Sequence, residues 1–326
     1  MRFAALIVLA LIGIGVIACA DKAGSTAAAP PKWVSGASDY PSSRYITGIG
    51  SGITRDIAAD RARNDLAKTI SVSVESAERS KTSSALKGEF ESAFSSAVNV
   101  RVSQTVGGVE IAERYYDETN KIYYALAVLD RAKNAMRLGA ELSQKELEVG
   151  VLLNEANVES DPLNKVKALS LANRLLNERR EIAAILAVID AMPPSAYKGQ
   201  SDILASRRAA LRSVKFSVGG DYEGKKLLSE AISAIGFTLT EQDKSDYQAI
   251  GYFKNDVRAE NGWQWARAVL ETEIVDYEYG TTRRAFILEV KESSQTAQTA
   301  QARALEALRN NLAERLLDAI VAEVGD

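Results

Sequence analysis

Residues 45–70 have the sequence YITGIGSGITRDIAADRARNDLAKTI, which predicts the first strand and the first long helix of the chain. Its first part alternates larger side chains with glycines, which predicts a strand over residues 45–52. Its second part predicts a helix over residues 56–70, because apolar residues recur there every four positions on one face. The residues of that face are Ala58, Ala62, Leu66 and Ile70. A helix that follows a strand and packs on it is typical of an α+β domain.

Three glycines, Gly48, Gly50 and Gly52, lie where this strand meets the helix. Backbone N–H groups in such a place can bind an anion. The spacing is not G-x-G-x-x-G and no Gly-Lys-Ser/Thr follows, so neither nucleotide-binding fingerprint is present. We therefore expect the glycines to form a tight strand-to-helix turn.

The remainder of the first block, residues 33–133, predicts further strands and one more helix. Residues 83–97 predict the helix, because Leu86, Phe90 and Phe94 recur there every four positions. Two runs of alternating aliphatic residues predict strands. The first run is Val72 and Val74, and the second is Val98, Val100, Val102, Val109 and Ile111.

Two tyrosine runs near the end of this block predict a hairpin. They flank residues 117–121, and a hairpin places such runs opposite each other on neighbouring strands. The four tyrosines are Tyr115, Tyr116, Tyr123 and Tyr124. Because exposed tyrosines suit protein interfaces, we interpret this hairpin as the candidate partner surface.

The second block, residues 134–212, has apolar residues at helical spacing, with breaks at residues 159–162 and 193–194. This pattern predicts an antiparallel helical hairpin that acts as a spacer. The first helix is expected to contribute Leu142, Leu147, Val151 and Leu152 to the interface.

The third block, residues 213–326, predicts a strand and helix, then long strands and a closing amphipathic helix. Asn261-Gly262 predicts a tight hairpin turn between two of the long strands. The expected fold class is therefore α+β, with two helix-backed antiparallel sheet domains joined by a helical hairpin spacer.

The amino terminus has the plan of a lipoprotein signal peptide over residues 1–18. A positively charged start precedes an unbroken apolar run that ends at the only cysteine, Cys19. The residues in front of this cysteine resemble the bacterial lipobox, which directs its lipidation and cleavage before it. They are Val16, Ile17 and Ala18. The alternative is an uncleaved transmembrane anchor, since about 17–20 apolar residues span a bilayer.

Residues 19–32 are small and polar and predict a flexible tether after the lipidated cysteine. Position two of the mature chain is Ala20, and not the Asp that often retains such lipoproteins at the inner membrane. We therefore expect a lipid anchor in the outer membrane, with the domains in the periplasm or at the cell surface.

Several of these features together resemble the LPP-twenty family of bacterial lipoproteins over residues 31–131. They are the segment PKWV at residues 31–34, the strand YITGIGSG, the helical segment ADRARNDLA at residues 59–67 and the Ser/Val strand that follows. The resemblance implies an outer-membrane or surface lipoprotein that is not known to be catalytic. Some relatives serve in flagellar outer-membrane assembly, which makes such a role one expectation for this chain.

The composition excludes several kinds of chemistry. The 326 residues include no histidine and one cysteine, so Ser-His-Asp and Cys-His pairs, imidazole metal sites and intrachain disulfides are excluded. The net charge of −3 argues against nucleic acid as a partner. We expect no catalytic residue, no metal site and no cofactor.

Other candidate sites have simpler interpretations. Trp263 and Trp265 share one face of a strand and can stack on sugar rings, but we expect them to pack on the sheet. A glycosidase needs two carboxylates, yet acids spaced by two along a strand also describe a solvated face. These acids are Glu110, Glu113, Asp117, Glu271, Glu273, Asp276 and Glu278. The arginine pairs at residues 179–180, 207–208 and 283–284 are expected to be surface charges or ion pairs.

The sequence thus predicts a non-catalytic, lipid-anchored cell-envelope protein that acts by protein–protein contact. The membrane is a partner through the lipid on Cys19, and the protein partners are unidentified envelope proteins. The sequence leaves the oligomeric state open. One alternative is a periplasmic binding module that regulates a peptidoglycan-synthesis enzyme. The other is a carboxylate-dependent hydrolase.

Overall fold

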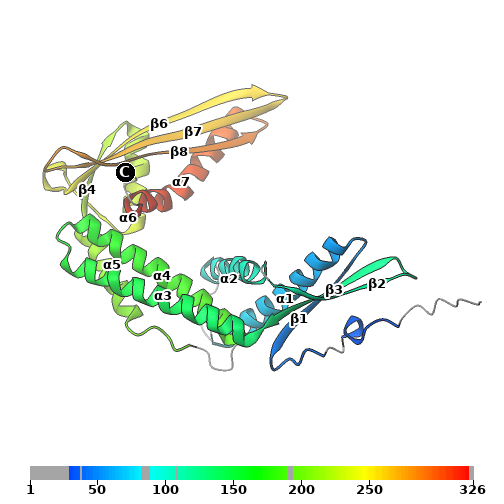
Figure 1. Cartoon of the computed structure of the whole chain (residues 1–326). Helices are drawn as coiled ribbons and strands as arrows, with labels where there is room; N and C mark the ends of the chain where they lie inside the picture. Colours follow the sequence, from blue (N-terminus) through cyan, green and yellow to red (C-terminus); the bar gives the residue numbers. More distant parts are fainter. Residues whose placement is uncertain (1–28, 37–38, 82–88, 108, 190–193, 323–326) are drawn as a thin grey trace, which may run out of the picture.

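The structure of the protein is a computed structural model that describes residues 29–36, 39–81, 89–107, 109–189 and 194–322. The predicted signal peptide, the lipobox and Cys19 lie outside these residues, as do Leu86 and Pro193. Two sheet domains lie at the two ends of a pair of long helices (Figure 1). The predicted α+β class, with a helical pair between two sheets, is confirmed.

The first sheet contains three antiparallel strands in the order β1-β3-β2. They are β1 (Tyr45–Gly52), β2 (Ile111–Asp117) and β3 (Ile122–Asp130). The helices of this domain are η1 (Lys32–Ser35), α1 (Arg55–Lys81) and α2 (Glu89–Gly107). The predicted apolar stripe of α1 is almost fully buried against β1 and β3.

Gly48, Gly50 and Gly52 lie inside β1 and not in a turn after it, so that prediction was wrong. They allow α1 to lie directly against the strand. A Cβ on Gly48 would come within 2.4 Å of the Ala62 carbonyl oxygen, and one on Gly50 within 2.2 Å of the Ala58 carbonyl oxygen. Both distances are far below van der Waals contact, so a side chain at either glycine would push the helix off the sheet.

The two valine runs that predict strands lie largely in helices, so this prediction was also wrong. Val72 and Val74 belong to α1, and the run from Val98 to Val102 belongs to α2. Val98 and Val102 are buried and lie four positions apart, whereas Val72 and Val100 are exposed. Alternate valines also contain the four-residue spacing of a helix, and packing into a shared core decides between the two.

The central helices form the predicted antiparallel pair. They are α3 (Arg131–Val158) and α4 (Pro162–Ile189), and α5 (Gln200–Ser213) follows them. The buried stripe of α3 is Leu138, Leu142, Val149 and Ala156. Leu147 and Val151 are exposed, contrary to the prediction, because each lies two positions from Val149 and so faces the opposite side of the helix.

The second sheet contains five strands in the order β5-β4-β6-β7-β8. The elements are β4 (Lys215–Gly220), α6 (Tyr222–Ile235), β5 (Thr238–Leu239), η2 (Gln242–Lys244), β6 (Tyr247–Glu260), β7 (Trp263–Asp276), β8 (Thr282–Ser294) and α7 (Ala297–Val321). β4 pairs in parallel with β5 and β6, so this sheet is mixed and not purely antiparallel. The reason is that α6 carries the chain back before β5 and β6 begin. Asn261 and Gly262 have positive φ values of 49° and 79°, as the predicted turn requires.

The helical pair shares a hydrophobic core with each sheet domain. Ile182 and Ile185 of α4 belong to the core that includes α1, and Leu163 and Val166 belong to the core that includes Phe216 of β4. Because the helical pair is buried against a sheet at each end, it fixes the position of both sheets.

Charged side chains strengthen the first of these junctions. The Arg101 guanidinium of α2 donates hydrogen bonds to Glu141 of α3 at 2.8 Å and to Glu181 of α4 at 3.0 Å. The Arg101 side chain is mostly buried, so solvent screens these contacts less than surface ion pairs.

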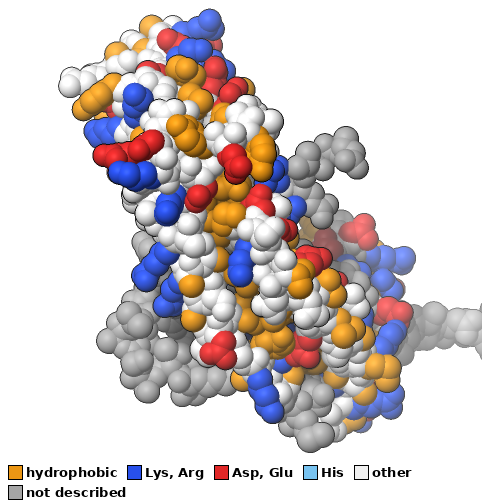
Figure 2. Space-filling model, turned by 90° about the vertical axis from the view of Figure 1, so that its left-hand side faces the viewer, with side chains coloured by type: hydrophobic (Ala, Val, Ile, Leu, Met, Phe, Trp, Pro, Cys, Tyr) orange, Lys and Arg blue, Asp and Glu red, His pale blue; other side chains and the backbone are white. Residues whose placement is uncertain are grey.

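The surface carries a mixture of both charges. Figure 2 shows basic and acidic side chains interspersed over the face that it presents, with no area of one sign across it. Among the described residues, none of the helices is both long enough and apolar enough to span a bilayer.

Candidate functional site

The candidate site is the end of the β2–β3 hairpin, where the predicted tyrosine pairs are confirmed. Tyr115 lies opposite Tyr124 and Tyr116 lies opposite Tyr123 in the strand register. The ring centroids are 6.1 Å apart in the first pair and 4.4 Å apart in the second. Such cross-strand aromatic pairs stabilise a hairpin at its end.

The turn of this hairpin is organised by Asp117. Its carboxylate accepts hydrogen bonds from the backbone N–H groups of Thr119 at 2.9 Å and Asn120 at 3.0 Å. The hydrogen bonds from Asn120 are the main reason why the pKa of the Asp117 carboxyl lies below its usual value. Lys121 takes a positive φ of 56°, which closes the turn. The hairpin end is therefore a well-defined structure.

Two arginines lie beside the tyrosines. The Arg55 guanidinium, at the start of α1, lies 5.8 Å from the centroid of the Tyr123 ring, within the range of a cation–π contact. Arg114 lies on β2 next to Tyr115. Neither arginine forms an ion pair with a carboxylate of the described residues.

Residues of the hairpin end and Arg55 surround a shallow hollow of about 360 Å³. Because neighbouring residues of a strand point to opposite faces, the rings of Tyr116 and Tyr123 lie on one face of the hairpin and those of Tyr115 and Tyr124 on the other. The hollow is lined by Arg55, Arg114, Tyr115, Tyr116, Tyr123 and Tyr124. Its lining is aromatic and positively charged, and no carboxylate contributes to it. Tyrosine and arginine are the residue types that most often dominate the binding energy of protein interfaces.

Trp263 and Trp265 do not pack as predicted. They are 47% and 45% exposed, on the face of β7 that points away from the helices. Ala266 and Ala268 on the other face are buried in the core with α7. The two indole rings are therefore part of an open sheet face, where Arg258 lies opposite Trp265.

Three of the acids considered for a hydrolase have structural partners. The Asp276 carboxylate is buried and accepts hydrogen bonds from the backbone N–H groups of Glu278 and Tyr279. Glu271 lies 3.2 Å from the Lys254 ammonium, and Asp117 holds its turn. The described residues include no group of three acids or cysteines arranged to hold a metal ion.

Two of the ion pairs predicted for the arginines are present, Arg179 with Glu146 and Arg283 with Asp161. Arg179 is 6% exposed, and its guanidinium donates to Glu146 at 2.6 Å and to the Ser195 carbonyl at 2.7 Å. Arg207 donates to the Ser170 hydroxyl at 3.1 Å. These contacts hold α4 to its neighbours.

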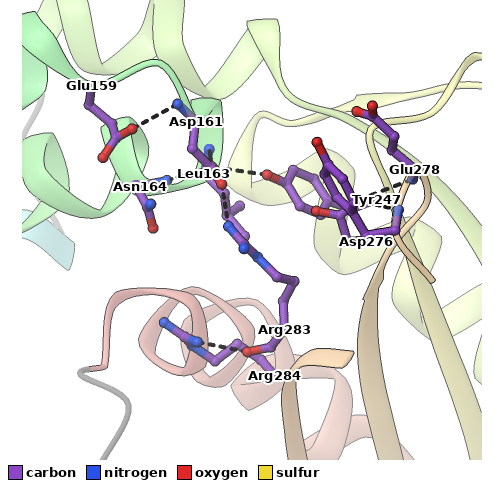
Figure 3. Close-up of polar contacts among 10 residues, drawn as sticks. Glu159, Asp161, Leu163, Asn164, Tyr247, Asp276, Glu278, Arg283 and Arg284 are labelled. Atoms are coloured by element: carbon purple, nitrogen blue, oxygen red, sulfur yellow. Dashed lines mark hydrogen bonds and ion pairs between the residues drawn. The ribbon is translucent and has the colours of Figure 1, made fainter. Parts of the chain in front are cut away.

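No pattern in the sequence predicts one further polar cluster. Figure 3 shows Asp161, Tyr247 and Arg283 converging from the start of α4, the start of β6 and the start of β8. The Tyr247 hydroxyl donates to Asp161 at 2.9 Å, and the Arg283 guanidinium forms an ion pair with the same carboxylate. The cluster ties the second sheet to the helical pair.

The electrostatics of this cluster follow from its burial and its hydrogen bonds. Burial works to raise the pKa of the Asp161 carboxyl, but the backbone N–H of Asn164, the Tyr247 hydroxyl and Arg283 hold it below the usual value. Burial, followed by the hydrogen bond to Asp161, raises the pKa of Tyr247 well above its usual value. The carboxylate and the neutral phenol are thus the favoured forms in the folded protein.

Comparison with known proteins identifies the first domain. Residues 31–130 match the model of the LPP20 lipoprotein family. No protein of curated function matches the chain. The chain is also similar to several solved structures at low identity.

The secreted protein HP1454 from Helicobacter pylori is 16% identical, over 85% of this chain and 98% of that one, with a TM-score of 0.45. A minor lipoprotein from Acinetobacter baumannii is 16% identical, over 32% of this chain and 90% of that one, with a TM-score of 0.28. Lipoprotein GNA1162 from Neisseria meningitidis is 10% identical, over 31% of this chain and 99% of that one, with a TM-score of 0.23.

Proposed function

We propose that this chain, whose residues 31–130 are an LPP20 lipoprotein domain, is a non-catalytic cell-envelope protein that acts by protein–protein contact. The observation that carries the proposal is the hollow at the end of the β2–β3 hairpin, where Arg55 lies beside the paired rings of Tyr116 and Tyr123. Large, rigid aromatic rings beside an arginine bury much surface at low entropic cost, which is the usual composition of a binding hot spot.

The anchor in this proposal is a lipid on Cys19. Membership of residues 31–130 in a lipoprotein family supports it, together with the lipobox Val16, Ile17 and Ala18. Ala29 lies ten positions after Cys19, so the start of the domain lies at most about 35 Å from the bilayer surface. Ala20 after the cysteine favours the outer membrane. The partner is then an envelope protein within reach of that membrane, which includes proteins of outer-membrane assembly.

The scaffold of this proposal is the helical pair. Because α3 and α4 share a core with both sheets, the tyrosine hairpin is presented in a fixed direction. A surface that is already ordered before binding loses less entropy when a partner docks, which raises affinity.

Site-specific photocrosslinking in cells tests the proposal. A photoreactive amino acid replaces Tyr116, and in a matched strain it replaces Tyr279, an exposed tyrosine on the other sheet domain. We expect a discrete crosslinked partner from position 116 that disappears when Arg55 and Arg114 are both changed to Gln. Equal crosslinking from both positions, or a product that the arginine changes do not affect, would contradict the proposal. If the partner captured at position 116 is a peptidoglycan synthase, the regulatory alternative replaces the assembly role.

A further inference from the structure

The open edge of β1 has unpaired backbone groups. β1 is an edge strand because the strand order is β1-β3-β2 (Figure 1). The Arg131 N–H donates to the Arg44 carbonyl at 2.9 Å, which directs the backbone groups of the even-numbered residues of β1 toward β3. The N–H and C=O groups of Thr47, Ile49 and Ser51 therefore point away from β3, toward the open edge of the sheet.

Two of these outward groups are bound by side chains of α1. The Asp65 carboxylate accepts from the Ile49 N–H at 3.0 Å, and the Arg61 guanidinium donates to the Ser51 carbonyl at 2.8 Å. Within the residues that the structure describes, Thr47 and the remaining groups of Ile49 and Ser51 have no hydrogen-bond partner on this side. Two donors and two acceptors thus stay available along the edge.

A groove lies beside this edge. Its volume is about 800 Å³, and residues 49–51 of β1 form one wall. Residues of α1 and α2 form the rest, among them Lys68, Val72 and Asn99. Val72 is exposed and offers an apolar contact, whereas the other lining side chains named here are polar. The groove therefore combines main-chain hydrogen-bonding groups with side-chain contacts.

The packing of α1 on β1 excludes pairing of β1 with β1 of a second copy. The helix lies directly over the strand, as the contacts of Gly48 and Gly50 with its backbone require. Neighbouring strands are about 4.8 Å apart, whereas packed helices need about 8–10 Å between their axes. Antiparallel pairing of β1 with β1 of another copy would place both α1 helices on one face and too close together.

We infer that the outer edge of β1 is a strand-addition site, which binds an extended segment of a partner protein in the groove between β1 and helices α1 and α2. In this mode main-chain hydrogen bonds supply affinity and the groove walls supply specificity. A single extended segment needs only one strand spacing, and it carries no helix that would collide with α1. The site is separate from the tyrosine hairpin.

Asp65 and Arg61 also fit a protective role. Natural proteins cover exposed edges with charged side chains to prevent unwanted pairing. Strand addition requires that these two side chains give way, because they bind the groups that an incoming strand would use. The two roles differ in a measurable way: a binding edge gains affinity when a competing side chain is removed.

The first test uses a displayed library of random ten-residue peptides selected against the full chain in detergent. The best selected peptide is then synthesised with single backbone N-methyl groups at each position in turn. Strand addition predicts an alternating result, in which every second N-methyl group weakens binding at least tenfold and the others do not, because alternate N–H groups face β1. A library that yields no binder, or a binder without this alternation, would overturn the inference.

The second test changes the protein. Thr47→Pro removes an N–H that points to the edge and leaves the hydrogen bonds with β3, so it should weaken the peptide at least tenfold. Asp65→Ala frees the Ile49 N–H and should strengthen binding about threefold or more. Tyr116→Ala, at the hairpin, should leave binding unchanged. Circular dichroism shows whether Thr47→Pro folds. If it does not fold, the N-methyl series alone tests strand addition. Unchanged affinity in a folded Thr47→Pro variant, or weaker binding by Asp65→Ala, would contradict the inference.

Discussion

Tyr247 and Asp161, 86 positions apart in the chain, are joined by a hydrogen bond of 2.9 Å between the phenol hydroxyl and the carboxylate. Tyr247 is buried at the start of β6, and Asp161 also accepts from the backbone N–H groups of Leu163 and Asn164 at the start of α4. One carboxylate thus begins a helix and holds a sheet against it.

Tyr247→Phe should lower the free energy of unfolding by about 1–3 kcal/mol, because the hydrogen bond to a charged group is lost while the ring still fills its site. Urea denaturation measures this change. Tyr252→Phe is the control, since Tyr252 is exposed on the same strand and should change the stability by less than about 0.5 kcal/mol. Equal effects of the two substitutions would show that the hydroxyl of Tyr247 contributes nothing.

The same hydrogen bond predicts that the stability of the protein depends on pH in the alkaline range. Because the pKa of Tyr247 is raised in the folded protein, its stabilising effect is complete below the pKa of an unfolded tyrosine, about 10, and declines as the pH rises above it. The difference in stability between the protein and Tyr247→Phe should therefore narrow above pH 10. Other titrating groups cancel in this difference. A gap that stays constant or widens up to pH 11 would be the opposite result.

Gly50→Ala should destabilise the protein by about 2–3 kcal/mol, because the new Cβ would lie 2.2 Å from the Ala58 carbonyl oxygen and the helix would have to shift. Gly139→Ala is the control. No atom lies within 4 Å of a Cβ at Gly139 on α3, so alanine there should be neutral or stabilise by up to about 1 kcal/mol. Thermal unfolding of both variants measures the contrast, and an equal shift in both would contradict the close packing of α1 on β1.

Local patterns predicted the parts of the fold that local chemistry determines. The tyrosine hairpin was predictable because a short turn sets the register of its two strands. The Asn261-Gly262 turn was predictable because few residues adopt two positive φ values in succession. The helices at Val74 and Val98 were not predictable, since alternate valines fit a strand and a helix equally and only the shared core distinguishes them.

The candidate site, too, was predictable from the sequence only in part. The four tyrosines were visible in the sequence, but the contribution of Arg55 was not, because the turn after β1 brings it against Tyr123. The cluster at Asp161 depends on Arg283, 122 positions away, and no sequence pattern connects the two. The edge groups of β1 became apparent only from the order of the strands.

Tryptophan fluorescence checks the open face of the second sheet. Trp263 and Trp265 are nearly half exposed, whereas Trp33 is 4% exposed. The double variant Trp263→Phe/Trp265→Phe should emit from Trp33 alone, at shorter wavelength and with weak quenching by acrylamide. The variant Trp33→Phe should retain emission at longer wavelength with strong quenching. The reverse assignment would show that the two indoles of β7 are covered.

The lipid anchor makes the most direct prediction in cells. Cys19→Ser should abolish labelling by an acyl-lipid precursor, because thioether formation needs the sulfur. Two or three acyl chains hold a protein at a bilayer essentially permanently. Ala20→Asp is the matched variant: it keeps the cysteine and the label, and it should shift the labelled protein from the outer to the inner membrane. Labelling that survives Cys19→Ser would refute the lipobox. Labelling that is lost in Cys19→Ser, with no shift in Ala20→Asp, would confirm the anchor and refute the assignment to the outer membrane.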